Sequence, residues 1–294
     1  MEHLLTFIGF GEAAYHIAKG LSAEGMTGMV AYDMMQDSET AGPVIRRRAA
    51  EAGVTLAAGT QEACQGARFV LSLTSAAVCV KVAQSVLPLL KEGQTYVDMN
   101  SAAPTAMTEI DQLPRPEGVD FCDVAMMGSV PAGGHQTKMF LSGSGAQAFF
   151  TAMQPFHTKM NVLDTPAGSA SALKMFKTVF SKGLPQLLLE CFVPAAKYGV
   201  LDEILSSVNN TFKEKNIEQY ADKVLFRTLI HAQRRSGEMR DAAQTVESMG
   251  LDASMSRAAQ HKLEELGARN FKEKIGPDEQ PDLRKVIELL LEND

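Results

Sequence analysis

The stretch LLTFIGFGEAA at residues 4–14 decides the fold of the first half of the chain. Its apolar start predicts a buried β-strand, and the rest fits Gly-x-Gly-x-x-Ala where a helix begins. In this pattern Gly9 permits a tight turn, Gly11 lets a pyrophosphate approach the backbone, and Ala14 lets the helix pack against the sheet. Free N–H groups at the helix N-terminus then face the phosphates. A structural glycine turn is the alternative, but we expect a dinucleotide to be bound by Gly9, Phe10, Gly11, Glu12, Ala13 and Ala14.

An acidic residue follows at the distance expected of a dinucleotide site. Asp33 comes 22 positions after Gly11 and ends a predicted strand at residues 28–32. A carboxylate there accepts hydrogen bonds from the adenosine ribose and repels a 2′-phosphate. We therefore expect NAD as the cofactor, with NADP as the alternative. The run Arg46, Arg47 and Arg48 could reach a 2′-phosphate, but we expect it to form a solvated helix face.

The rest of the first half alternates strands with helices. Beyond the first strand, predicted strands lie at residues 28–32, 69–73, 95–99, 119–125, 139–141 and 161–163. Predicted helices lie at residues 12–24 and 76–90. Such alternation is typical of βαβ units. We therefore expect an α/β fold in which residues 1–164 form a Rossmann domain with a doubly wound, mostly parallel sheet.

The second half predicts helices only. They are expected at residues 167–197, 202–209, 218–233, 237–248, 254–266 and 283–292, with a surface linker over residues 272–283. Pro185 and Pro194 should kink the first of these helices or split it. We therefore expect an all-helical C-terminal domain at residues 165–294.

Composition and charge exclude several classes of protein. Lys and Arg number 28 against 35 Asp and Glu, a net charge of −7, which disfavours nucleic acid as a partner. No apolar run is long enough for a membrane helix, and the N-terminus lacks the basic start of a signal peptide, so we expect a cytoplasmic protein with no membrane partner. Four cysteines without C-x-x-C spacing and six histidines without H-x-x-x-H spacing suggest no metal site.

Residues 165–189 hold three lysines and no Asp or Glu. At about 100° per residue, Lys174, Lys177, Lys182 and Thr178 share one helix face. The other side of the helix carries the apolar residues Phe176, Val179 and Phe180. We expect these side chains to pack against the rest of the protein, so that the helix is largely buried. Buried lysines without a carboxylate need an anion or a water-filled cleft, whereas a solvated basic face is the alternative.

Proton transfer during hydride transfer from an alcohol requires a base. Lys174 can serve if burial and the neighbouring lysines lower its pKa, and Lys177 is then placed to meet an anionic substrate. His231, Arg234 and Arg235 form a second basic cluster, although the two arginines could simply pair with Glu238 one helical turn away.

Polar residues follow two of the predicted strands. Asn100 and Ser101 come after the strand at 95–99, and Thr74 and Ser75 after the strand at 69–73. Ligands of open α/β sheets bind beyond these carboxyl ends, so we expect Thr74 and Ser75 at the nicotinamide ribose. The alternative for Asn100 and Ser101 is to cap the helix that follows Pro104.

Together these strings resemble the β-hydroxyacid dehydrogenases, the family of 3-hydroxyisobutyrate and 6-phosphogluconate dehydrogenases. The resemblance spans nearly the whole chain and rests on four blocks, Gly9–Ala14, Asp98–Ser101 with Pro104, Asp123–Gly134 and Gly168–Lys174. It implies that Lys174 is the catalytic acid/base and that the helical domain forms a homodimer. The substrate-binding residues that it implies, together with the basic residues above, are Asn100, Ser101, Gly128, Ser129, Lys177, Thr178 and His231.

The chain departs from the family pattern in two places. Met127-Gly128-Ser129 stands where the family usually has Ser-Gly-Gly, and Thr178 stands where it has a functional Asn. The chain thus resembles a divergent, phosphogluconate-dehydrogenase-like branch, and the better-known substrates are not transferred. We expect an NAD(P)-dependent oxidoreductase that acts on a small hydroxy acid or its oxo form. An imine reductase-like enzyme and a non-catalytic dinucleotide sensor are the alternatives.

Overall fold

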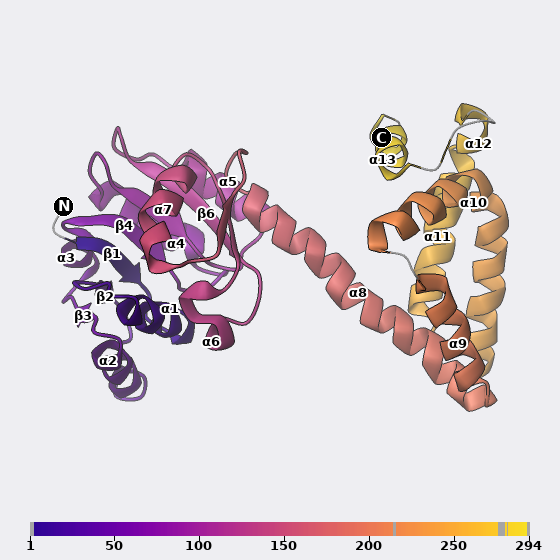
Figure 1. The fold of residues 1–294 in the computed structure, drawn as a ribbon, viewed down its shortest axis with the longest axis horizontal. Helices are drawn as coiled ribbons and strands as arrows, with labels where there is room; N and C mark the ends of the chain where they lie inside the picture. Colours follow the sequence, from indigo (N-terminus) through magenta and orange to yellow (C-terminus); the bar gives the residue numbers. More distant parts are fainter. Residues whose placement is uncertain (1–2, 214–215, 276–279, 281, 293–294) are drawn as a thin grey trace. The chain divides into compact units, whose positions relative to one another are not determined.

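The computed structural model describes residues 3–213, 216–275, 280 and 282–292 (Figure 1). The chain divides into two units, Met1–Val179 and Phe180–Asp294. One helix, α8 (Ser169–Tyr198), contributes residues to both units. The domain boundary near residue 165 stays a prediction.

The first unit is built on one eight-stranded sheet with the strand order β3-β2-β1-β4-β5-β6-β7-β8. All neighbouring strands are parallel except β6 and β7. The predicted doubly wound, mostly parallel sheet is therefore confirmed. The strands are β1 (His3–Ile8), β2 (Val30–Tyr32), β3 (Thr55–Leu56), β4 (Ala67–Ser72), β5 (Thr95–Asp98), β6 (Asp120–Met126), β7 (Met139–Ser142) and β8 (Met160–Val162).

Helices connect the strands of this sheet. The predicted helix at residues 76–90 is shorter in the structure, because its first three residues form a turn and its end is the 3₁₀ turn η1 (Leu87–Leu89). The helices are α1 (Glu12–Ala23), α2 (Gly42–Glu51), α3 (Thr60–Cys64), α4 (Cys79–Val86), α5 (Pro104–Gln112), α6 (Val130–Gly133) and α7 (Ala146–Met153), with further 3₁₀ turns η2 (Gly134–Gln136) and η3 (Gln154–Phe156).

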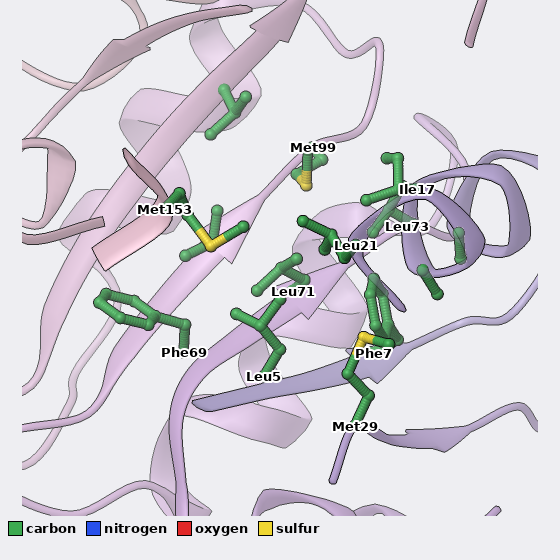
Figure 2. Close-up of a cluster of buried hydrophobic side chains, with 14 of the residues drawn as sticks. Leu5, Phe7, Ile17, Leu21, Met29, Phe69, Leu71, Leu73, Met99 and Met153 are labelled. Carbon is green, nitrogen blue, oxygen red and sulfur yellow. The ribbon is translucent and has the colours of Figure 1, made fainter. Parts of the chain in front are cut away.

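Side chains from both faces of the sheet are buried. Successive residues of one strand belong to different hydrophobic clusters. Phe7 of β1 lies in one cluster, and its neighbour Ile8 lies in another. Figure 2 shows Leu5, Phe7 and Leu71 of the sheet gathered near α1. Burial on both faces explains why these strands read as continuous apolar runs. It leaves the carboxyl ends of the strands as the open edge of the sheet, where polar residues follow.

The second unit contains helices only among its described elements, as predicted. They are the remainder of α8, with α9 (Leu201–Phe212), α10 (Ile217–Ser248), α11 (Ser254–Ala268), α12 (Phe271–Lys274) and α13 (Leu283–Leu291). Two predicted helices form the single element α10, whose backbone is non-helical at His231 (φ −113°, ψ 19°). Neither Pro185 nor Pro194 splits α8. The predicted linker at 272–283 begins within α12, and its residues 276–279 and 281 lie outside the described residues.

The expected burial of the lysine helix is wrong for this chain. Phe176, Val179 and Phe180 are 72%, 74% and 54% exposed. Lys177 and Lys182 are exposed as well, whereas Lys174 is half-buried. An apolar helix face predicts that another surface covers the helix. It does not predict whether that surface belongs to the same chain or to a partner.

Candidate functional site

The turn after β1 has the geometry that a dinucleotide site requires. Gly9 has φ +87°, and a Cβ placed on it would lie 2.5 Å from the carbonyl oxygen of Leu73. A Cβ on Gly11 would meet no protein atom within 4 Å, so space is open at the N-terminus of α1. Ala14 is fully buried against the core. The turn therefore requires the glycine at position 9 and helix packing the small residue at position 14, and the open space at Gly11 is what an approaching pyrophosphate would need.

A cavity of about 520 Å³ lies beside this turn. Its wall includes five of the predicted cofactor residues: Gly9, Gly11, Asp33, Thr74 and Ser75. The side chain of Phe10 is buried in the core instead, and Glu12, Ala13 and Ala14 are not part of the wall. Other residues of the wall were not predicted from the sequence, among them Tyr32, Met34, Thr60, Val78 and Val82. The available signal was the four-residue spacing of Val78 and Val82 within the helix predicted at residues 76–90.

The carboxylate of Asp33 is held in place by two backbone amides. Its Oδ2 accepts a hydrogen bond from Phe10 N at 2.7 Å, and its Oδ1 accepts one from Met35 N at 2.8 Å. The first of these bonds ties the end of β2 to the glycine turn. The position of the carboxylate in the wall of the cavity is thus fixed by these two hydrogen bonds.

The three arginines of α2 have different surroundings. Arg46 donates to the carbonyl oxygen of Gln36, and Arg47 lies 3.8 Å from Glu51 on the solvated face. Arg48 instead lines a second hollow, of about 380 Å³, to which Gly11 and Asp33 also contribute. The expectation of a solvated face therefore fits Arg47 best, and Arg48 is the arginine of this run that borders the predicted cofactor residues.

Lys174 and Ser101 meet directly. The Nζ atom of Lys174 donates a hydrogen bond to Ser101 Oγ at 2.6 Å. Burial lowers the pKa of the Lys174 ammonium below its usual range. At a given pH, a larger fraction of a lysine with a lowered pKa is neutral than of an exposed lysine, and only the neutral amine can act as a base.

Asn100 lies behind this pair, with its side chain buried and directed inward. Its Nδ2 donates to both oxygens of Asp98 and to Ser72 Oγ, and its Oδ1 accepts from Thr74 N at 2.8 Å. The alternative role of helix capping is wrong, because Ala103 is the N-cap of α5 and no side chain caps it. Asn100 therefore joins the cavity-lining loop at Thr74 to the segment that carries Ser101.

The other predicted substrate residues are placed differently. Gly128 and Ser129 are exposed in the loop after β6. The Thr178 hydroxyl donates to the Lys174 carbonyl within α8. His231 is exposed and belongs to the second unit. In the same helix Arg234 pairs with Glu238, as the alternative predicted, whereas Arg235 contacts Thr228.

Two buried acids bond to the segments that carry Ser101 and Lys174, and neither acid was predicted as a site residue from the sequence. Asp98 and Asp123 have no exposed surface. The available signal was an acid within an otherwise apolar strand, since a buried charge always needs partners.

The described part of the chain offers no metal site or membrane span. Among its residues, no three of His, Cys, Asp or Glu are gathered closely enough to hold a metal ion. None of its helices combines the length and apolar character needed to cross a bilayer.

The fold and the glycine turn define an NAD(P)-binding oxidoreductase of the dehydrogenase and reductase class. The chain belongs to the family described by the NAD binding domain of 6-phosphogluconate dehydrogenase, whose model matches residues 5–163. A domain of unknown function, DUF1932, matches residues 195–266. The predicted resemblance is therefore confirmed.

Two relatives share sequence with this chain at similar levels. A conserved hypothetical protein from Sinorhizobium meliloti 1021 is 32% identical, with coverage of 99% of this chain and 97% of that chain and a TM-score of 0.66. An uncharacterized 28.5 kDa protein from Methanothermus fervidus is 28% identical over 58% of this chain, and the match spans 65% of that protein's length.

Two further solved structures carry functional descriptions. A conserved protein of unknown function, described as structurally similar to 3-hydroxyacid dehydrogenases, is 25% identical with a TM-score of 0.63, over 91% of this chain and 98% of that chain. An imine reductase from Aspergillus terreus is 17% identical with a TM-score of 0.73, over 98% of this chain and 99% of that chain, and this likeness concerns the fold.

Proposed function

We propose that this protein transfers a hydride between NAD(P) and a small hydroxy acid or its oxo form, with Lys174 as the acid/base. The observation that carries the proposal is the 2.6 Å contact of Lys174 Nζ with Ser101 Oγ, next to the residue that holds the cavity loop. The predicted residues Gly128 and Ser129 are proposed to complete the substrate site.

The chemistry divides between the cofactor and the chain. The nicotinamide, when bound, exchanges a hydride with the substrate carbon. The neutral amine of Lys174 accepts the proton of the substrate hydroxyl in oxidation, and its ammonium returns the proton in reduction. The Ser101 hydroxyl, which accepts a hydrogen bond from Nζ, keeps the lysine directed toward this position. Exposed Lys177 is proposed to attract the anionic group of the substrate.

The proposal is tested by measuring NADH and NADPH turnover with a panel of 2- and 3-oxo acids and cyclic imines. We expect turnover with one or more oxo acids. Turnover of imines alone would favour the imine reductase-like alternative, and binding of the cofactor without turnover of any compound would favour a dinucleotide sensor.

Cofactor preference follows from Asp33. We expect NAD(H) to bind more tightly than NADP(H), because the fixed carboxylate would face the 2′-phosphate. Asp33→Ala should weaken NAD binding by the worth of one or two charge-assisted hydrogen bonds, about 1.5–3 kcal/mol each. Titration of both cofactors by nucleotide fluorescence measures this, with Asp37→Ala in the same loop as the control. Tighter binding of NADP(H) by the unmodified protein would contradict the prediction.

We further propose that the protein is cytoplasmic, as expected from the sequence, and that it forms a homodimer. Uncovered apolar surface supports the homodimer. Exposed apolar side chains recur along α8, among them Phe176, Val179, Leu189 and Val193. Helix α9 is strongly amphipathic in sequence, yet none of its residues is fully buried. Apolar surface on this scale normally marks an interface. A second copy of the chain is the partner that the family resemblance implies.

Sedimentation velocity at micromolar concentration should therefore give the mass of a dimer. Val179→Glu should shift the protein toward the monomer, because a charge would be buried without a partner. Val44→Glu, an exposed apolar position on α2, is the matched control and should leave the mass unchanged. A monomer for the unmodified chain would overturn the dimer.

A further inference from the structure

Two buried carboxylates stand side by side at the carboxyl edge of the sheet. Asp98 ends β5, Asp123 lies in the neighbouring strand β6, and the two are direct partners in the strand register. Both are fully buried. Neither takes part in the proton transfer proposed above, so their position needs another explanation.

Asp98 holds the segment that carries Ser101. Its Oδ1 accepts from Asn100 N at 2.8 Å and from Asn100 Nδ2 at 2.9 Å, and its Oδ2 accepts from Asn100 Nδ2 at 3.1 Å. Both the backbone amide and the side-chain amide of Asn100 are therefore hydrogen-bonded to Asp98. Ser101 is the next residue, so these hydrogen bonds restrict the direction in which the backbone presents the Ser101 side chain.

Asp123 holds the start of the helix that carries Lys174. Its Oδ2 accepts from Gly168 N and Ser171 N, each at 3.0 Å, and its Oδ1 accepts from Ser171 Oγ at 2.7 Å. Ser142 Oγ donates to Asp123 Oδ2 and accepts from Ala170 N. A side chain from the sheet therefore satisfies the free amides at the N-terminus of α8, three residues before Lys174.

The described surroundings of both carboxylates are hydrogen-bond donors without positive charge. The Coulomb repulsion of Asp123 adds to burial in raising the pKa of Asp98. Burying two neighbouring carboxylates without a cation opposes folding. Apolar or amide residues would fill the same space at lower cost, so the carboxylates are best explained by what they hold.

We propose that Asp98 and Asp123 are positioning residues that set the Lys174–Ser101 pair from its two sides, Asp98 through Asn100 and Asp123 through the first turn of α8. The mechanistic meaning of the pair rests on the proposed function, but the positioning itself does not. Loss of either carboxylate should leave the chain folded and the pair loose, with Lys174 more open to water.

The test reads the reactivity of the Lys174 amine and needs neither substrate nor cofactor. Trace acetylation with acetic anhydride is followed by mass spectrometry across neutral to alkaline pH, and Lys177 and Lys182 of the same helix serve as internal references. In Asp98→Asn and Asp123→Asn, the midpoint for Lys174 should rise, since lost burial returns its pKa toward the usual range of a lysine. Asp120→Asn, on β6 but at its start, should leave the midpoint unchanged.

Two milder variants keep the test decisive if a carboxylate variant fails to fold. Ser171→Ala removes one hydrogen bond to Asp123, and Ser72→Ala removes one partner of Asn100. Each should move the Lys174 midpoint in the same direction by a smaller amount. An unchanged midpoint in the folded variants would overturn the positioning role. Unchanged activity in Lys174→Ala would instead overturn the proposed function and leave the labelling result standing.

Discussion

Lys174→Ala is expected to lower kcat by about 10²–10⁴, the usual contribution of a general acid/base. The rate should fall because the variant lacks the proposed acid/base, which among the described residues is the only amine in contact with Ser101. Cofactor affinity should be nearly unchanged, because Lys174 is not part of the wall of the cavity beside the glycine turn, where we expect the dinucleotide to bind. The measurement is steady-state kinetics on the substrate that the oxo-acid panel identifies, with a separate titration of the cofactor.

Lys177→Ala is the matched control for this prediction, since it removes a lysine from the same helix. It should chiefly raise KM, because it removes binding that the ground state and the transition state share. The pH profile adds a second check: kcat for oxidation should rise with pH through the lowered pKa of Lys174, and kcat for reduction should fall. Near-normal kcat in Lys174→Ala would exclude this lysine as the acid/base.

The contribution of Asp98 to the unfolding free energy is expected to fall as the pH rises from about 4 to about 6. Burial raises the pKa of this carboxyl from 3.8 to about 6. Because the folded state holds the proton more tightly than the unfolded state, stability is lost as the pH rises through this window. A shift of about two pKa units corresponds to on the order of 3 kcal/mol.

Asp98→Asn removes this titration while keeping the size of the side chain. The unfolding free energy of the variant, relative to the unmodified protein, should therefore increase by on the order of 3 kcal/mol between pH about 4 and about 6. The titratable groups around Asp98, namely Asp123, Cys79 and Tyr96, are common to both proteins. Amide exchange at Tyr96 and Val97 restricts the signal to the first unit. Parallel pH curves would show that Asp98 titrates alike when folded and unfolded.

The sequence carried enough information to predict the sheet and its cofactor turn. Gly9 and Ala14 have local structural reasons, and such reasons can be predicted from residue type and spacing. Strand β3 was missed because two residues give no periodic signal. The sequence predicted two helices where the structure has the single helix α10, because a helix can continue through one irregular residue such as His231.

The residues of the candidate site were easier to predict from the sequence than the contacts that each of them makes. Asn100 and Ser101 are adjacent and polar, yet one is buried in a hydrogen-bond network and the other meets Lys174. Only the three-dimensional path of the chain after β5 separates these two roles. Phe176 and Val179 fit an apolar helix face, but sequence alone does not show whether the same chain covers them.

The two amides that hold Asp33 matter for any redesign of cofactor preference. Exchanging Asp33 for a small neutral residue would relieve repulsion of a 2′-phosphate, but it would also leave Phe10 N and Met35 N without their acceptor. The glycine turn would then loosen together with the change in preference. An engineered NADP-dependent version therefore needs a replacement side chain that still accepts both hydrogen bonds, with Arg48 at the neighbouring hollow as the natural source of positive charge.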